Sequence, residues 1–124
     1  MNFLVMLFVY SAFAQTPPTL ETLSEKINED LPEVIDRMTK IRKTTVENNH
    51  LTYHVLVDAT PAESATALPK VKQQILSTIC SNKRQRMALM ELNAPIVYRY
   101  ENVKGQSVGE FMVPADLCKK TSEH

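Results

Sequence analysis

Two carboxylates near the C-terminus, Glu101 and Glu110, lie on neighbouring predicted strands where an acid pair could hydrolyse a glycosidic bond. That chemistry needs carboxyl groups about 5–9.5 Å apart whose pKa values differ. Arg99 and Lys104 stand close to them in the sequence, and surface ion pairs are the simpler interpretation. A small carboxylate-dependent hydrolase acting on the cell wall or on a secreted substrate is therefore an alternative hypothesis and not the leading one.

The histidines and serines form no catalytic or metal-binding pattern. His50 falls in a predicted turn and His124 in the tail, whereas His54 is mid-strand and could meet a carboxylate across the sheet. No serine has the flanking residues of a nucleophile elbow, and no CxxC pair or histidine cluster suggests zinc. We expect no metal and no cofactor, and enzymatic activity is uncertain, with a non-enzymatic role favoured.

A tyrosine, an arginine and a second tyrosine, Tyr98, Arg99 and Tyr100, are the predicted binding residues. Because side chains alternate along a strand, the two tyrosines share one face and Arg99 points to the other. Exposed tyrosines close to arginine have the composition of a protein-binding hot spot. The alternative is that helices cover the tyrosine face, which would place both rings in the core and leave Arg99 in solvent.

The two cysteines, Cys80 and Cys118, suit a single disulfide in an exported protein. The bridge would tie the end of a helix to the segment after the last strand. In the chain-entropy model, a disulfide that closes a loop of this size stabilises the folded protein by about 3–4 kcal/mol. The alternative is a pair of reduced, buried thiols.

Residues 3–14 are almost wholly apolar and end in Ala12-Phe13-Ala14, a small-x-small site for signal peptidase. We therefore expect a signal peptide at 1–14 and one small domain at 15–124, with an ordered core at about 20–118. The run is too short for a comfortable membrane span, which needs about 20 apolar residues. No lysine or arginine precedes it, so an uncleaved anchor or a buried strand stays open.

The net charge of zero argues against binding to nucleic acid or to an acidic membrane surface. The charges are uneven, with six acids and one base in residues 21–36, and thirteen bases and eight acids afterwards. The acidic segment could fold back on the basic remainder or face a partner.

Hydrophobic periodicity predicts the order helix, hairpin, helix, helix, hairpin. The helices are expected at residues 20–27, 69–81 and 83–92, with a short helical turn capped by Asp30 and carrying Val34, Ile35 and Met38 on its inner side. Strands are expected at 41–46, 51–57, 96–101 and 107–113, where β-branched and alternating residues gather. Gly109 within the last strand suggests a bulge or a close backbone approach. The fold class is α+β, with about four antiparallel strands in two hairpins, two or three helices on one face and one disulfide.

Several pieces of the chain, in this order, resemble a group of small, mostly uncharacterised exported bacterial proteins. They are Leu31-Pro32 with Val34-Ile35-Asp36, Leu51-Thr52-Tyr53, Cys80, Tyr98-Arg99-Tyr100, Asn102 with Gly105, Gly109 with Phe111, and Asp116 with Cys118. The resemblance implies a two-hairpin α+β domain with a disulfide and implies no known activity.

The leading functional hypothesis is an exported, non-enzymatic binding module, periplasmic or secreted, whose partner is another protein. A small-ligand carrier, with the ligand held between sheet and helix, is a further alternative besides the hydrolase. Nucleic acid is not an expected partner, nor is a stable membrane span expected after signal cleavage.

Overall fold

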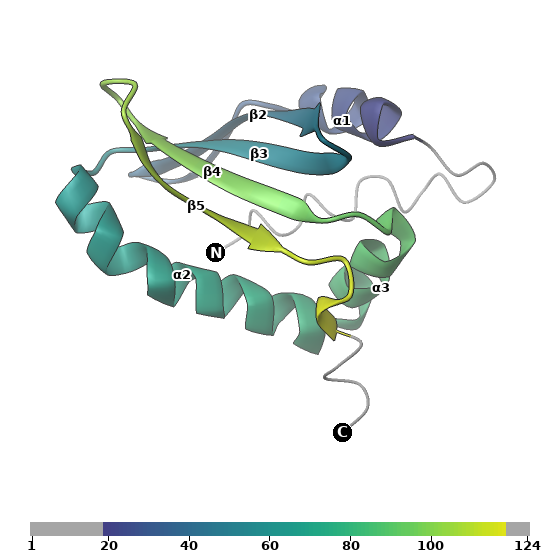
Figure 1. The fold of residues 1–124 in the computed structure, drawn as a ribbon. Helices are drawn as coiled ribbons and strands as arrows, with labels where there is room; N and C mark the ends of the chain where they lie inside the picture. The colour runs from purple at the N-terminus through teal and green to yellow at the C-terminus, as the bar shows by residue number, and fades with distance from the viewer. Residues whose placement is uncertain (1–18, 119–124) are drawn as a thin grey trace.

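The computed structural model describes residues 19–118, so the predicted signal peptide at 1–14 lies outside the described residues. This part of the chain forms three helices and five strands (Figure 1). In order they are α1 (Leu20–Asn28), β1 (Glu33–Asp36), β2 (Thr39–Glu47), β3 (His50–Val57), α2 (Pro61–Ser81), α3 (Lys83–Leu92), β4 (Ile96–Asn102) and β5 (Ser107–Val113). No helix among residues 19–118 is long and apolar enough to cross a membrane.

The five strands form one sheet in the order β1-β2-β3-β4-β5. The predicted hairpins are β2–β3, whose turn residues Asn48 and Asn49 have positive φ, and β4–β5, whose turn contains Gly105 at φ +78. The two hairpins join through a parallel pairing of β3 with β4, and α2 and α3 make the crossover between them. The α+β class and the order of elements are confirmed, but the sheet is mixed and not wholly antiparallel.

The fifth strand, β1, replaces the short helical turn that the sequence predicted after Asp30. Val34 pairs with Lys40 of β2, and Asp36 pairs with Thr39 after an irregularity in the register. The β-branched side chains of Val34 and Ile35 favour an extended backbone, and pairing with β2 satisfies backbone groups that a single helical turn would leave open. The capping pattern at Asp30 and Pro32 was therefore misleading.

The periodicity of the apolar residues predicted that this helix begins at Pro69, but α2 begins eight residues earlier, at Pro61. Thr60 and Glu63 form a capping box: Thr60 Oγ1 accepts from the Glu63 N–H at 3.1 Å, and Glu63 accepts from the Thr60 N–H at 2.9 Å. Pro61 occupies the first turn, where its missing N–H costs nothing. Pro69 lies inside the helix and has no N–H to donate to the carbonyl of Ala65. Both residues are exposed, so water can donate to that carbonyl instead.

All three helices lie on one face of the sheet, as predicted. In α1, Ser24 Oγ contacts Thr44 Oγ1 at 2.7 Å, and Thr44 is the cross-strand partner of Tyr53. In α2, Leu68 lies against Gly109, the partner of Tyr100, which shares its face with Tyr53. Figure 1 shows α1 beside β2 and α2 beside β5, so the helices cover opposite margins of the same face.

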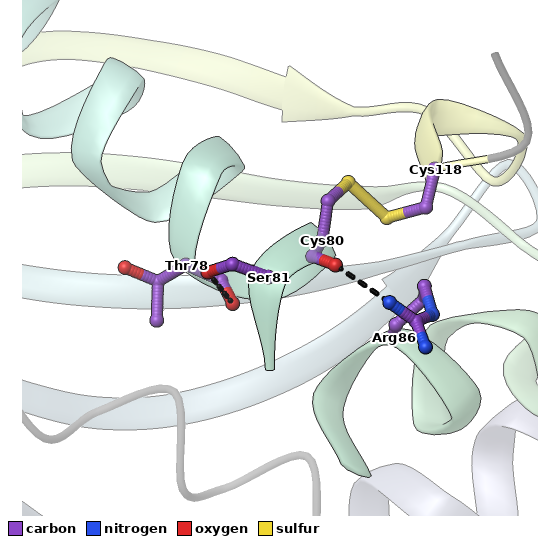
Figure 2. Close-up of a disulfide and its surroundings, with 5 residues drawn as sticks. All are labelled: Thr78, Cys80, Ser81, Arg86 and Cys118. Carbon is purple, nitrogen blue, oxygen red and sulfur yellow. Dashed lines mark hydrogen bonds between the residues drawn. A yellow bond between two sulfur atoms is a disulfide. The ribbon is translucent and has the colours of Figure 1, made fainter. Parts of the chain in front are cut away.

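A disulfide between Cys80 and Cys118 fastens the helical layer to the end of the sheet (Figure 2), which confirms the predicted clasp. The two Cα atoms are 5.3 Å apart, and Cys118 is buried in the core. Arg86 of α3 donates a hydrogen bond to the carbonyl of Cys80 at 3.0 Å. The bridge therefore holds the C-terminal ends of α2 and β5 together, and Arg86 adds α3 to the same junction.

Candidate functional site

The candidate site is a cavity of about 550 Å³ on the helix-covered face, between the β1–β2 turn and the N-terminal half of α2. Its floor is formed by Val55 and Val57 of β3 and Tyr100 of β4. One wall is the turn between β1 and β2, and the other is the N-terminal half of α2. The lining residues are Asp36, Arg37, Met38, Thr39, Val55, Val57, Ala59, Glu63, Ser64, Ala67, Leu68, Val71 and Tyr100.

The helical wall is held against the sheet by the contact between Leu68 and Gly109. A Cβ built on Gly109 would overlap Leu68 Cδ1, and Gly109 has φ +152, a conformation that L side chains rarely adopt. The glycine coincides with an irregularity in the β4–β5 register, next to its partner Tyr100. Both readings of Gly109 that the sequence suggested, a bulge and a close approach, are therefore confirmed. Because Gly109 has no side chain, Leu68 can pack directly against the backbone of β5. This contact sets the distance between α2 and the sheet.

The opposite wall is a tight turn that projects an apolar side chain into solvent. Asp36 Oδ1 accepts a hydrogen bond from the N–H of Met38 at 2.8 Å, and the carbonyl of Met38 accepts from the N–H of Asp58 at 2.8 Å. With the backbone fixed in this way, Met38 stays 53% exposed at the rim, whereas Val34 of β1 points to the other face of the sheet with its partner Lys40. Large exposed apolar side chains beside a concave surface are typical of interaction sites.

Charged groups lie at the rim of the cavity and not on its floor. Asp36 and Arg37 come from the β1–β2 turn, Glu63 comes from α2, and all three are exposed. The backbone N–H and the hydroxyl of Thr60 hydrogen-bond to Glu63 and lower the pKa of its carboxyl. The Glu63 carboxyl is therefore ionised at neutral pH, and the charged groups of the rim surround an interior lined by uncharged side chains.

Two hydroxyl groups are placed in this otherwise apolar interior. Tyr100 is 4% exposed and Ser64 is 5% exposed, and both line the cavity. Neither hydroxyl has a hydrogen-bond partner within residues 19–118. Burial raises the pKa of Tyr100, so the phenol stays protonated and can donate as well as accept.

The structure separates the three predicted binding residues. Tyr98 is buried and stacked between Tyr53 and Phe111, with ring centroids 5.2 and 5.1 Å away. Tyr100 lies on the floor of the cavity, as just described. Arg99 points to the opposite face of the sheet. The helices thus cover the tyrosine face, which is the alternative that the sequence left open, and the three residues form no common surface.

Arg99 belongs to a row of charged groups on that opposite face. It lies 3.4 Å from Glu47 and 3.3 Å from Glu110, while His54 Nε2 lies 2.7 Å from the hydroxyl of Thr45. Thr45 lowers the pKa of the Glu47 carboxyl, burial opposes that shift, and Arg99 adds to the lowering. These are cross-strand ion pairs of the kind the sequence suggested for Glu110.

The acid pair considered for hydrolysis, Glu101 and Glu110, does not line the cavity. Glu110 is exposed and engaged by Arg99. Within the described residues no three His, Cys, Asp or Glu side chains come together in a group that could hold a metal ion. The cavity therefore brings together apolar and hydroxyl groups, which suit binding better than acid–base chemistry.

Sequence reasoning missed the cavity, together with the roles of Met38, Ser64 and Leu68 in it. One signal was available: the Thr60-Pro61-Ala62-Glu63 stretch is a capping box with proline in the first turn, which would have placed Ser64 and Leu68 on a helix. No local signal marks the cavity, because it depends on where the β1–β2 turn and α2 pack against the sheet.

Residues 14–119 match the model of the family described as "Putative quorum-sensing-regulated virulence factor". The chain belongs to this family. Membership supports the resemblance to a group of small exported bacterial proteins. No curated protein matches the chain in sequence.

Three solved structures share the fold. A Pseudomonas aeruginosa protein described as a "putative secreted protein" is 22% identical, has a TM-score of 0.67, and is matched over 95% of this chain and 98% of its own. EpsS, the pilotin of the Vibrio vulnificus type 2 secretion system, is 16% identical with a TM-score of 0.60, over 80% and 87%. AspS, the type II secretion system pilotin of Vibrio cholerae, is 22% identical with a TM-score of 0.56, over 86% and 99%.

Proposed function

We propose that this protein is an exported, non-enzymatic binding module that docks on another protein through the rim of the cavity. The observation that carries the proposal is the apolar side chain of Met38, which stays 53% exposed at the rim of a concave apolar surface. Burying apolar area is the main favourable term in protein association. A partner that covers Met38 would gain that term and extend its contact into the cavity mouth.

Export is supported by features from both ends of the chain. The Cys80–Cys118 disulfide is of the kind that persists in oxidising compartments such as the periplasm or the extracellular space. The apolar run at residues 3–14 fits a signal peptide. The similar Pseudomonas aeruginosa protein, described as "putative secreted protein", points the same way. A periplasmic or secreted location follows from these features.

The likeness to two pilotins of secretion systems favours a partner that is itself part of a protein assembly. Of the predicted binding residues, Tyr100 contributes to the docking site as part of the cavity floor. Arg99 is assigned to the cross-strand ion pairs on the other face, and Tyr98 to the core.

Site-specific photo-crosslinking in the source bacterium tests the proposal, because the chain offers two matched pairs of positions. Met38 is 53% exposed at the rim, and Met112 is 50% exposed on the other face of the sheet. Arg37, exposed at the rim, is matched by Lys104, exposed in the β4–β5 turn. A photoreactive residue is introduced at each of the four positions in turn.

We expect a discrete crosslinked product with one protein from positions 37 and 38 and none from 104 and 112. Met38→Glu should then abolish the crosslink made from position 37, while Met112→Glu leaves it intact. If all four positions give the same products, or if none gives any, the rim is not a docking surface. The proposal would then be wrong.

A further inference from the structure

The interior of the cavity has the size and chemistry of a small-molecule site, which is a different property from the docking rim. Its volume of about 550 Å³ lies within the range of about 300–1,000 Å³ that is usual for ligand pockets. Such pockets combine a mostly apolar lining with a few polar groups that orient the ligand. Val55, Val57, Leu68 and Val71 supply the apolar lining here.

The polar groups of the interior are the hydroxyls of Tyr100 and Ser64, which come from β4 and α2 on two sides of the cavity. Both side chains are more than nine-tenths buried, yet neither hydroxyl oxygen is among the buried side-chain atoms of residues 19–118 that are sealed off without a partner. The two hydroxyls therefore open onto the cavity, where a ligand can replace the water that would otherwise solvate them.

The charges around the cavity limit what can enter it. Asp36 and Glu63 already accept backbone hydrogen bonds at the rim, and Arg37 is exposed beside them. The interior itself offers no ion to pair with, and an unpaired buried charge is strongly unfavourable. The part of the ligand that is buried must therefore be uncharged.

We propose that this cavity binds a small uncharged amphiphile, with an apolar chain along Val55, Val57 and Leu68 and one hydroxyl or carbonyl group held by Tyr100 and Ser64. The proposal does not depend on protein docking at the rim. It assigns the space between sheet and helix to a ligand and the exposed residues above it to a partner.

A series of linear alcohols tests the proposal on the full mature chain with its disulfide formed. Binding of 1-hexanol, 1-heptanol and 1-octanol is followed by NMR titration, with 1-chlorooctane as a probe that lacks the hydroxyl. We expect affinity to rise by about fourfold for each added methylene, because each buried CH₂ contributes a constant transfer free energy. We also expect contacts from the alcohol chain to the methyl groups of Ala67 and Val71.

Matched variants separate the cavity from the rest of the surface. Ala67→Phe fills the cavity and should abolish binding of 1-octanol, whereas Ala65→Phe, at an exposed position of α2 that does not line the cavity, should not. Tyr100→Phe should lower the affinity for 1-octanol by about two- to tenfold, which is the usual contribution of one hydrogen bond. The affinity for 1-chlorooctane should not change.

The outcomes that overturn the proposal are equally specific. They are no saturable binding of any alcohol, binding that survives Ala67→Phe, or chain contacts that map away from Ala67 and Val71. The contact map needs only the unmodified protein, so it decides the matter even if a variant fails to fold. The alcohols are titrated into the isolated protein and the crosslinks are recorded in the cell, so failure of the docking proposal can be told apart from failure of this one.

Discussion

The side-chain amide of Asn28 takes the place of a peptide group beside Thr44. Its Nδ2 donates to the Thr44 carbonyl at 3.0 Å, and its Oδ1 accepts from the Thr44 N–H at 2.7 Å. Strand β1 pairs with β2 only as far as Ile41, so the backbone of Thr44 lies at an otherwise open sheet edge. Helix α1 therefore closes the edge of β2 where β1 ends.

We expect Asn28→Ala to lower the free energy of unfolding by about 2–3 kcal/mol. The substitution removes two backbone bonds and a third from Thr44 Oγ1 to Asn28 Oδ1 at 3.0 Å. Each such bond is worth about 1 kcal/mol net, and unpaired partners add to the loss. Urea denaturation measures the change. Glu25→Ala, at an exposed position of the same helix, is the control and should change stability little.

Local signals in the sequence predicted most of the elements. The β2–β3 turn was marked by Asn48 and Asn49, which tolerate positive φ, and the β4–β5 turn by Gly105. Helix α2 was placed correctly only in its second half, because Pro69 looked like a helix start. In the folded chain the cap at Thr60 and the burial of Ile75 and Ile79 stabilise the longer helix.

The cavity could not be predicted in the same way. Its floor residues, Val55, Val57 and Tyr100, follow the same alternation as ordinary core positions such as Tyr53. What distinguishes them is that no described helix fills the space above them. That depends on how far α2 packs from the β1–β2 turn, which long-range packing sets and no short stretch of sequence encodes.

Gly109→Ala should destabilise the protein more than Gly105→Ala does. At Gly109 an added methyl would overlap Leu68 in addition to straining the backbone, whereas at Gly105 nothing lies within 4 Å. Backbone strain costs about 1–2 kcal/mol, and an overpacked contact typically adds about 1–3 kcal/mol. Thermal or urea unfolding of the two variants compares them directly. Equal losses would show that Leu68 moves aside freely and does not hold the cavity wall.

Removal of the disulfide should cost about 3–4 kcal/mol of unfolding free energy. The bridge joins residues separated by 38 positions, and cross-linking a loop of that size restricts the unfolded chain by about this amount. The measurement is urea unfolding with and without a thiol reductant. The double variant Cys80→Ser with Cys118→Ser should be unaffected by the reductant. A wild-type midpoint that does not move on full reduction would contradict the prediction.

The stability of the protein should fall as the pH drops from about 7 to 5, and His54 should contribute to the fall. Burial is the main cause that lowers the pKa of His54 below its ordinary value near 6.5, with Lys43 and Arg99 adding to it. The unfolded chain therefore takes up the proton at a higher pH than the folded protein does. The His54 contribution is complete above the unfolded pKa and is lost as the pH falls towards the folded one. His54→Gln should flatten this part of the stability profile.

The charges that face His54 should move its pKa in opposite directions, which NMR titration of the imidazole can resolve. Glu47, whose Oε2 lies 3.8 Å from Nε2, and Glu101 raise the pKa, whereas Lys43 and Arg99 lower it. Glu47→Gln should therefore lower the pKa of His54 further, and Arg99→Gln should raise it. The hydrogen bond from Thr45 is the main cause that lowers the pKa of the Glu47 carboxyl, which favours its ionised form while His54 titrates. If both variants shifted the pKa of His54 in the same direction, the electrostatic coupling across β2, β3 and β4 would not be the cause.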